Sequence, residues 1–254
     1  MDAMLIPTAE PFFFPGNRTG CLLVHGFTGA PKEMRWMGEY LAQKGYTALG
    51  VRLAGHATRP QDMLRARWTD WVASVEDGYH LLRGATDQVF VIGLSMGGVL
   101  ALIHASRHPV AGLVIMSTPY ALADDWRLPY IQYLHRIQPA LQKGPPDWHN
   151  PAAALDHVDY PNYPTRAIAE LRDLLAESRK AIPQVHAPAL LVHSRGDAGV
   201  LPENMEKIYA NLGSTDKHML WVEDSGHVIP REPERERVFQ AAHEFIQRLT
   251  KPQP

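Results

Sequence analysis

Residues 89–101, with the sequence VFVIGLSMGGVLA, decide the fold of this 254-residue chain. An apolar run leads into Gly93, and a second apolar run follows Gly98. This order predicts a buried strand, a sharp turn and a helix, with Ser95 at the apex of the turn. A serine at such an apex has a positive φ, so a bulky side chain two residues before or after it would clash, and glycine removes the clash. The stretch therefore predicts a nucleophile elbow with an exposed serine hydroxyl.

The rest of the chain alternates short apolar runs with helical patterns, which is typical of a mostly parallel sheet covered by helices on both faces. The expected strands are residues 21–24, 48–53, 89–94, 113–117, 189–193 and 219–222, and the expected helices are residues 32–44, 69–82, 96–108, 203–212 and 233–249. The first 18 residues are a candidate for an additional antiparallel edge strand. The predicted fold class is α/β, and the length suffices for one large domain with an insertion.

Residues 120–185 interrupt the alternation. They contain eight prolines and several aromatic residues, and although residues 165–180 have a helical pattern, no strand is expected in this segment. An insertion between two core strands would lie over the carboxyl ends of the strands, where open α/β sheets place their sites. We therefore predict a core formed by residues 1–119 and 186–254, with residues 120–185 as a small helical lid. The alternative is a surface excursion without a function.

The predicted lid carries apolar and aromatic side chains that have no core strand to pack against. We expect an amphipathic lid to place them over the apolar floor around Ser95, where they would form the acyl pocket. The candidate substrate-binding residues are Trp126, Leu128, Tyr130, Ile131 and Leu134.

A serine hydroxyl is a poor nucleophile at neutral pH and needs a neighbouring base, which in turn needs an orienting acid. With this type of elbow the chain order is serine, acid, histidine. Asp197 follows one predicted strand, and His227 lies in a glycine-containing loop after the next. We therefore expect Ser95 to be the nucleophile, Asp197 the acid and His227 the general base. Asp224 is the rival acid, but it precedes the histidine by only three residues and is poorly placed to orient it.

A tetrahedral intermediate also needs hydrogen-bond donors for its oxyanion. The backbone N–H of Met96 follows the nucleophile at a helix N-terminus, and the N–H of Phe27 lies in the glycine-containing loop after the first core strand. We expect these two groups to form the oxyanion hole. No metal or cofactor is expected, because His104 and His108 have a ligand-like spacing but lack the glutamate and third ligand of a zinc site.

Composition narrows the possible partners. The net charge of −2 gives no electrostatic basis for binding nucleic acid or an anionic membrane. No apolar stretch approaches the length of a membrane span, so stable membrane insertion is not expected. The single cysteine, Cys21, excludes an intrachain disulfide and indicates a buried apolar residue rather than a nucleophile. We expect a cytoplasmic protein that acts on a small molecule, and the sequence leaves its oligomeric state open.

Several motifs together resemble the α/β-hydrolase superfamily, and within it the bacterial carboxylesterase and monoacylglycerol lipase group. They are HGFTG at residues 25–29, GYT at residues 45–47, the elbow at residues 93–98, Asp197, and SGHV at residues 225–228. The resemblance implies a catalytic triad at the positions of Ser95, Asp197 and His227, an oxyanion hole at Phe27 and Met96, and a small helical lid.

The predicted function is that of a serine carboxylic-ester hydrolase for short- to medium-chain acyl esters, with monoacylglycerols as candidate substrates. Hydrolysis of carbon–carbon bonds and acyl transfer to another alcohol use the same triad and stay open as alternatives. Epoxide hydrolase and dehalogenase chemistry is disfavoured, because those relatives carry aspartate at the position of Ser95. A non-catalytic receptor for small molecules is a further alternative, which covalent labelling of Ser95 by a fluorophosphonate would exclude.

Overall fold

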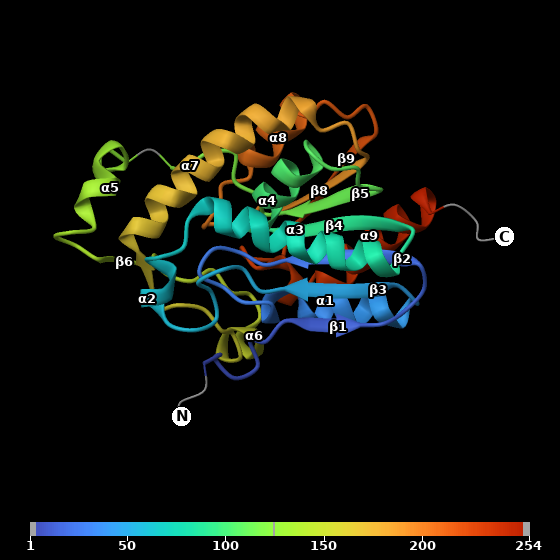
Figure 1. Ribbon diagram of the computed structural model, residues 1–254, viewed down its shortest axis with the longest axis horizontal. Coiled ribbons are helices and arrows are strands. Elements are labelled where there is room, and N and C mark those ends of the chain that lie inside the picture. Colours follow the sequence, from blue (N-terminus) through green and yellow to red (C-terminus); the bar gives the residue numbers. More distant parts are fainter. Residues whose placement is uncertain (1–3, 124, 251–254) are drawn as a thin grey trace.

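A computed structural model describes residues 4–123 and 125–250 of the chain. Its main element is a seven-stranded sheet in the order β1-β3-β2-β4-β5-β8-β9 (Figure 1). All neighbouring strands are parallel except β1 and β3, so the candidate antiparallel edge strand near the N-terminus is confirmed. The strands are β1 (Phe12–Phe14), β2 (Thr19–Val24), β3 (Thr47–Val51), β4 (Gln88–Leu94), β5 (Gly112–Met116), β8 (Ala189–Ser194) and β9 (Lys217–Val222).

Helices cover both faces of the sheet, which confirms the predicted α/β architecture (Figure 1). Successive side chains of a strand point to opposite faces, so Leu22 packs into the core of one face and Cys21 into the core of the other. One face is covered by α3 (Trp68–Ala85), α4 (Met96–Ala105), α7 (Thr165–Ala181) and α8 (Glu203–Asn211), and the other by α1 (Lys32–Gln43) and α9 (Arg235–Leu249). Two further short helices, α2 (Pro60–Met63) and η3 (Ile229–Arg231), lie in loops.

The segment between β5 and β8 contains several short elements. They are η1 (Leu128–Tyr130), α5 (Ile131–Leu134), β6 (Ala140–Gln142), α6 (Pro151–Leu155), β7 (Asn162–Pro164) and, after α7, η2 (Ile182–Gln184). The expectation that this segment holds no strand is wrong, because β6 and β7 form an antiparallel ribbon. Strands of three residues, one of them ending in proline, are too short to produce a period-two pattern in the sequence.

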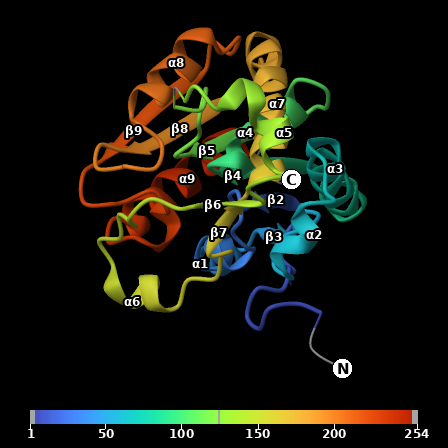
Figure 2. The same cartoon turned by 90° about the vertical axis from the view of Figure 1, so that its left-hand side faces the viewer.

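The structure divides the segment that was predicted to be a single lid. Helix α7 packs against α4 and buries Leu171, Leu174 and Leu175 in the core of that face, so it belongs to the helical layer. The shorter elements before it lie at one end of the molecule. Figure 2 looks onto this end and shows α5, α6 and the β6–β7 ribbon in front of the sheet. Any lid is therefore confined to the part of the chain that precedes α7.

Candidate active site

Ser95 lies in the turn between β4 and α4, with φ 54° and ψ −119°. Two glycines are needed for this turn. A Cβ at Gly93 would lie 2.3 Å from the carbonyl carbon of Gly97, and a Cβ at Gly97 would lie 2.1 Å from the carbonyl oxygen of Val24. The tight turn that the sequence predicts is therefore present. The prediction that the serine hydroxyl is exposed is wrong, since Ser95 is only 8 % exposed. Its hydroxyl is within hydrogen-bonding distance of the His227 imidazole.

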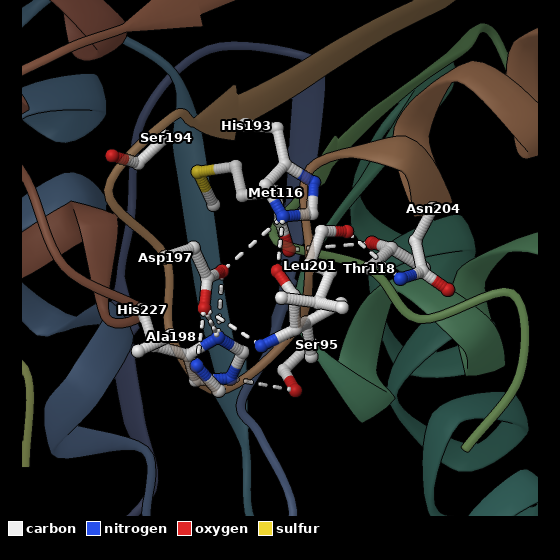
Figure 3. Close-up of polar contacts among 12 residues, drawn as sticks. Ser95, Met116, Thr118, His193, Ser194, Asp197, Ala198, Leu201, Asn204 and His227 are labelled. Carbon is white, nitrogen blue, oxygen red and sulfur yellow. Dashed lines mark hydrogen bonds and ion pairs between the residues drawn. The ribbon is translucent and has the colours of Figure 1, made fainter. Parts of the chain in front are cut away.

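The structure brings Ser95, His227 and Asp197 into one hydrogen-bonded series (Figure 3). Ser95 Oγ lies 3.0 Å from His227 Nε2, and His227 Nδ1 lies 2.9 Å from Asp197 Oδ2. When Nδ1–H donates to the carboxylate, Nε2 is left without a proton and can accept the one from the serine hydroxyl. The three side chains come from the loops after β4, β8 and β9, at the carboxyl end of the sheet.

The Asp197 carboxylate is held from several sides. Its Oδ1 accepts the N–H groups of Gly199 and Val200 at 2.9 and 2.8 Å. His193 Nε2 lies 3.2 Å from Oδ2, and because this nitrogen also lies 2.8 Å from the carbonyl oxygen of Val200, it carries the proton and donates. Figure 3 shows the carboxylate between the two imidazoles. Burial alone would raise the pKa of Asp197, but His227, His193 and the Val200 N–H hold it well below its ordinary range. The acid is therefore ionised and fixed in orientation.

The His227 imidazole has a pKa above its ordinary value of 6.5. Burial would lower this pKa, but the Asp197 carboxylate raises it, with further contributions from Asp147 and Glu33. Because only the neutral imidazole accepts a proton, the base is competent above its raised pKa. Its competence is lost as the pH falls through that value.

Asp224 does not contact His227. Its Oδ1 accepts a hydrogen bond from Nδ1 of His149 at 2.7 Å, and its side chain is 68 % exposed. This geometry favours Asp197 over Asp224 as the partner of the base.

The loop after β2 approaches the nucleophile. A Cβ at Gly26 would lie 3.4 Å from the Cβ of Ser95, so the loop that continues into Phe27 passes beside the serine. The N–H of Met96 opens α4 directly after Ser95, where helix N–H groups have no partner within the helix. His25 fixes the loop, because its Nδ1–H donates to the Gly26 carbonyl at 2.9 Å and its Nε2 accepts the N–H of Leu53, two residues after β3, at 3.2 Å. The two candidate oxyanion donors thus belong to the two backbone segments that meet at Ser95.

Glu33, in the first turn of α1, also holds this loop. Its Oε2 accepts the N–H of Gly26 at 2.8 Å, and a Cβ at Gly29 would lie 2.1 Å from its Oε1. The side chain is 6 % exposed. Burial raises the pKa of Glu33 to about 7, against the opposing effect of the Gly26 N–H. A carboxyl group close to its midpoint at neutral pH therefore underlies the candidate oxyanion loop.

The five predicted acyl-pocket residues lie in different surroundings. Trp126 and Tyr130 are 81 % and 64 % exposed, so most of each side chain faces solvent. Ile131 is buried, and Leu128 and Leu134 are partly buried. Ile131 and Leu134 belong to α5, a single short helix packed on α7, so only one of its faces is covered. The other three residues precede α5, in a turn and in η1.

Comparison with known proteins identifies the family. The model of a family described as serine aminopeptidase, S33, matches residues 16–234. The chain belongs to this family. It is 35 % identical over 246 residues to a thermostable monoacylglycerol lipase of Bacillus sp. (strain H-257), with 94 % of each chain covered. It is 30 % identical over 248 residues to a carboxylesterase of Bacillus subtilis (strain 168), covering 97 % of this chain and 99 % of that one.

Solved structures agree with this assignment to the S33 family. A structure from work on LipS and LipT, two metagenome-derived lipolytic enzymes, superposes with a TM-score of 0.90 at 33 % identity, covering 96 % of this chain and 99 % of that one. The S33-family chain is therefore a hydrolase with the α/β-hydrolase fold, as the resemblance implied. Across residues 4–123 and 125–250, none of its helices combines the length and apolar character needed to cross a membrane.

Three residues of this S33-family site were not singled out from the sequence. His193 contacts the acid, Glu33 supports the loop of Phe27, and Asp147 contacts the backbone of the base. His193 gave a weak signal, since it stands at the end of a predicted strand four residues before Asp197. Asp147 gave none, because it lies in a proline-rich stretch far along the chain from either loop that it contacts.

Proposed function

We propose that this S33-family protein hydrolyses carboxylic esters with short- to medium-chain acyl groups, monoacylglycerols among them, through an acyl-enzyme on Ser95. The observation that carries the proposal is the hydrogen-bonded series from Ser95 Oγ through His227 to Asp197. Similarity over nearly the full length to a carboxylesterase and to a monoacylglycerol lipase supports an ester as the substrate. A small-molecule ester is thus its expected partner, and the single cysteine suits a cytoplasmic location.

In the acylation step, Ser95 Oγ attacks the ester carbonyl carbon while His227 Nε2 takes the serine proton. Asp197 stabilises the imidazolium that forms. The N–H groups of Phe27 and Met96 donate hydrogen bonds to the oxyanion of the tetrahedral intermediate. The C–O bond then breaks, and the alcohol leaves with the proton that His227 returns to it.

In the deacylation step, His227 takes a proton from a water molecule, whose oxygen attacks the acyl carbonyl carbon. Collapse of the second tetrahedral intermediate breaks the bond to Ser95 Oγ, which recovers its proton from the imidazolium. The carboxylic acid leaves, and the enzyme returns to its starting protonation state.

The test uses a fluorophosphonate probe and a series of 4-nitrophenyl and glycerol esters. We expect the probe to label Ser95 and the protein to turn over esters, and the folded variant Ser95→Ala to lose both properties. Removal of such a nucleophile costs on the order of 10⁴-fold or more in kcat. A folded Ser95→Ala protein with a tenth of the native activity would refute the acyl-enzyme mechanism.

The same experiment separates the alternatives. The family description names an aminopeptidase, so an aminoacyl 4-nitroanilide belongs in the substrate series. Product analysis in the presence of a second alcohol measures acyl transfer. Labelling of Ser95 without turnover of any ester would overturn the proposed reaction, and absence of labelling would favour a non-catalytic receptor.

A further inference from the structure

Residues 147–150, named the clip, directly precede α6 within the predicted lid and contact the loop that carries His227. Asn150 Nδ2 donates to the carbonyl oxygen of Arg231 at 2.9 Å. The N–H of His149 donates to the buried carboxylate of Glu232 at 3.1 Å. The clip is therefore fixed to η3 and its flanking residue by contacts that do not involve the side chain of Asp147.

Asp147 is the residue of the clip that reaches the triad. Its Oδ2 accepts the backbone N–H of His227 at 3.0 Å and the backbone N–H of Ala198 at 3.0 Å. Ala198 directly follows Asp197 in the chain. A single carboxylate oxygen thus joins the loop of the acid to the loop of the base, and hydrogen bonds to a charged acceptor are stronger than those between neutral groups.

The base loop also fits closely against the backbone of the clip. A Cβ at Gly226 would lie 2.1 Å from the carbonyl oxygen of Asp147. Gly226 immediately precedes His227, so the absence of a side chain there allows the clip to approach the base. Contact through both the backbone and the side chain of Asp147 limits the positions that the imidazole can take.

We propose that Asp147 is a positioning residue, whose carboxylate fixes the spacing between the acid loop and the base loop and places a negative charge beside the imidazolium formed in catalysis. The inference rests on the proposed ester hydrolysis. Because the bonded atom of His227 is its backbone nitrogen, loss of the contact would shift the whole residue and change the 3.0 Å separation of Nε2 from Ser95 Oγ. A displacement of about 1 Å can lower the rate by about 100-fold.

The charge of Asp147 has a separate consequence. The groups with charge that face His227 are Asp197 from the loop after β8, Asp147 from the clip and Glu33 from α1, and each of them raises the pKa of the imidazole against the effect of burial. Removing one of these charges stabilises the neutral base relative to the imidazolium. The acid limb of the pH profile of kcat/KM should therefore move to lower pH.

Two variants separate the two effects. Asp147→Asn keeps an oxygen that can accept both N–H groups but removes the charge, whereas Asp147→Ala removes both. The matched controls are Asp224→Asn and Asp224→Ala, because Asp224 also binds the clip, through His149, but lies away from the triad. We measure kcat and KM on 4-nitrophenyl butyrate from pH 5 to 9, the rate of fluorophosphonate labelling, and thermal unfolding.

For Asp147→Ala we expect kcat to fall by roughly 10- to 100-fold while KM changes less than about threefold, since binding of the ester is retained. For Asp147→Asn we expect a smaller loss of kcat and an acid limb at lower pH. Both Asp224 variants should match the native protein. A purely structural role of Asp147 would lower the amount of active enzyme but would leave the acid limb where it is.

The inference is overturned if Asp147→Ala keeps kcat within about twofold of the native value, or if Asp147→Asn leaves the acid limb unchanged. Should Asp147→Ala fail to fold, the pH profile of Asp147→Asn decides alone. Failure of the proposed function is recognised separately, because native protein would then neither react with the fluorophosphonate nor hydrolyse the ester.

Discussion

The substitution Asp197→Asn tests the role of the acid most directly, because the structure determines how the new amide would be oriented. Oδ1 accepts the N–H groups of Gly199 and Val200, so the amide oxygen is needed at that position. The amide nitrogen must then replace Oδ2, which lies 2.9 Å from Nδ1 of His227 and 3.2 Å from Nε2 of His193. An NH₂ group in this place donates to His227 Nδ1 instead of accepting from it.

The rate should fall for two reasons. Donation to Nδ1 favours the tautomer with a proton on Nε2, and that nitrogen can then no longer accept the proton of Ser95. The imidazolium also loses the negative charge that stabilises it. Where an amide replaces the acid of such a triad, kcat falls about 10⁴-fold, or about 5.5 kcal/mol. The second N–H of the new amide faces the N–H of His193, which still donates to the carbonyl oxygen of Val200. The amide N–H is then a buried donor without an acceptor, which costs about 1–3 kcal/mol of folding stability.

The assay is steady-state turnover of 4-nitrophenyl butyrate at pH 8 by protein that thermal unfolding shows to be folded. Asp224→Asn is the matched control, since the side chain of Asp224 is exposed and accepts a hydrogen bond from His149. We expect the control to keep nearly full activity. The reasoning is refuted if Asp224→Asn loses more activity than Asp197→Asn, or if Asp197→Asn retains a tenth of the native kcat.

Three further predictions concern the oxyanion loop, metal dependence and the lid. Burial raises the pKa of Glu33 from an ordinary value of 4.5 to about 7, so between these pH values the carboxyl group is ionised in the unfolded chain but protonated in the folded protein. The free energy of unfolding should therefore fall by about 3 kcal/mol as the pH rises from 4.5 to 7. Glu33→Gln should remove most of this fall in urea unfolding at pH 5 and pH 8, and an unchanged pH dependence would contradict the assignment. Ester turnover should survive EDTA, because backbone groups hold the oxyanion and an imidazole is the base; activity lost in EDTA and restored by a divalent ion would refute this. Each further methylene that the pocket buries should contribute about 0.8 kcal/mol to kcat/KM, until the pocket ends. Ile131→Ala, at a buried position, should shift the acyl-chain length at which this rise stops, whereas Trp126→Ala, at an exposed position, should not. Equal losses on every ester would mean that Ile131 supports the fold rather than the pocket.

The sequence predicted the parallel sheet and the elbow because each depends on residues that are neighbours in the chain. Buried parallel strands appear as apolar runs, and the positive φ of Ser95 appears as glycines two residues away on either side. The surroundings of the individual residues in the predicted lid could not be predicted, for the opposite reason. The burial of Ile131 depends on which face of the short helix α5 meets α7, and a segment of four residues shows no helical period. Trp126 lies in a turn before η1, so its exposure depends on how that turn is placed.

The three triad residues and the residues that hold them in place differ in the same way in how far the sequence indicates them. Ser95, Asp197 and His227 could be assigned because each follows a predicted strand, and the carboxyl ends of parallel strands meet at one edge of the sheet. The position of Asp147 depends on a contact across 80 residues to the backbone of His227 and across 51 residues to Ala198. Its partners are backbone N–H groups, which every residue except proline possesses.

A backbone donor leaves no trace in the identity of the residue that carries it, so no pattern of residue types could indicate that Asp147 binds both loops. The same holds for Glu33, whose partner is the N–H of a glycine. Sequence patterns therefore indicate candidate side chains for the chemistry, whereas the groups that orient them become visible only once the loops are placed in space. Variants at these supporting positions consequently test the structure itself, independently of the motifs that suggested the reaction.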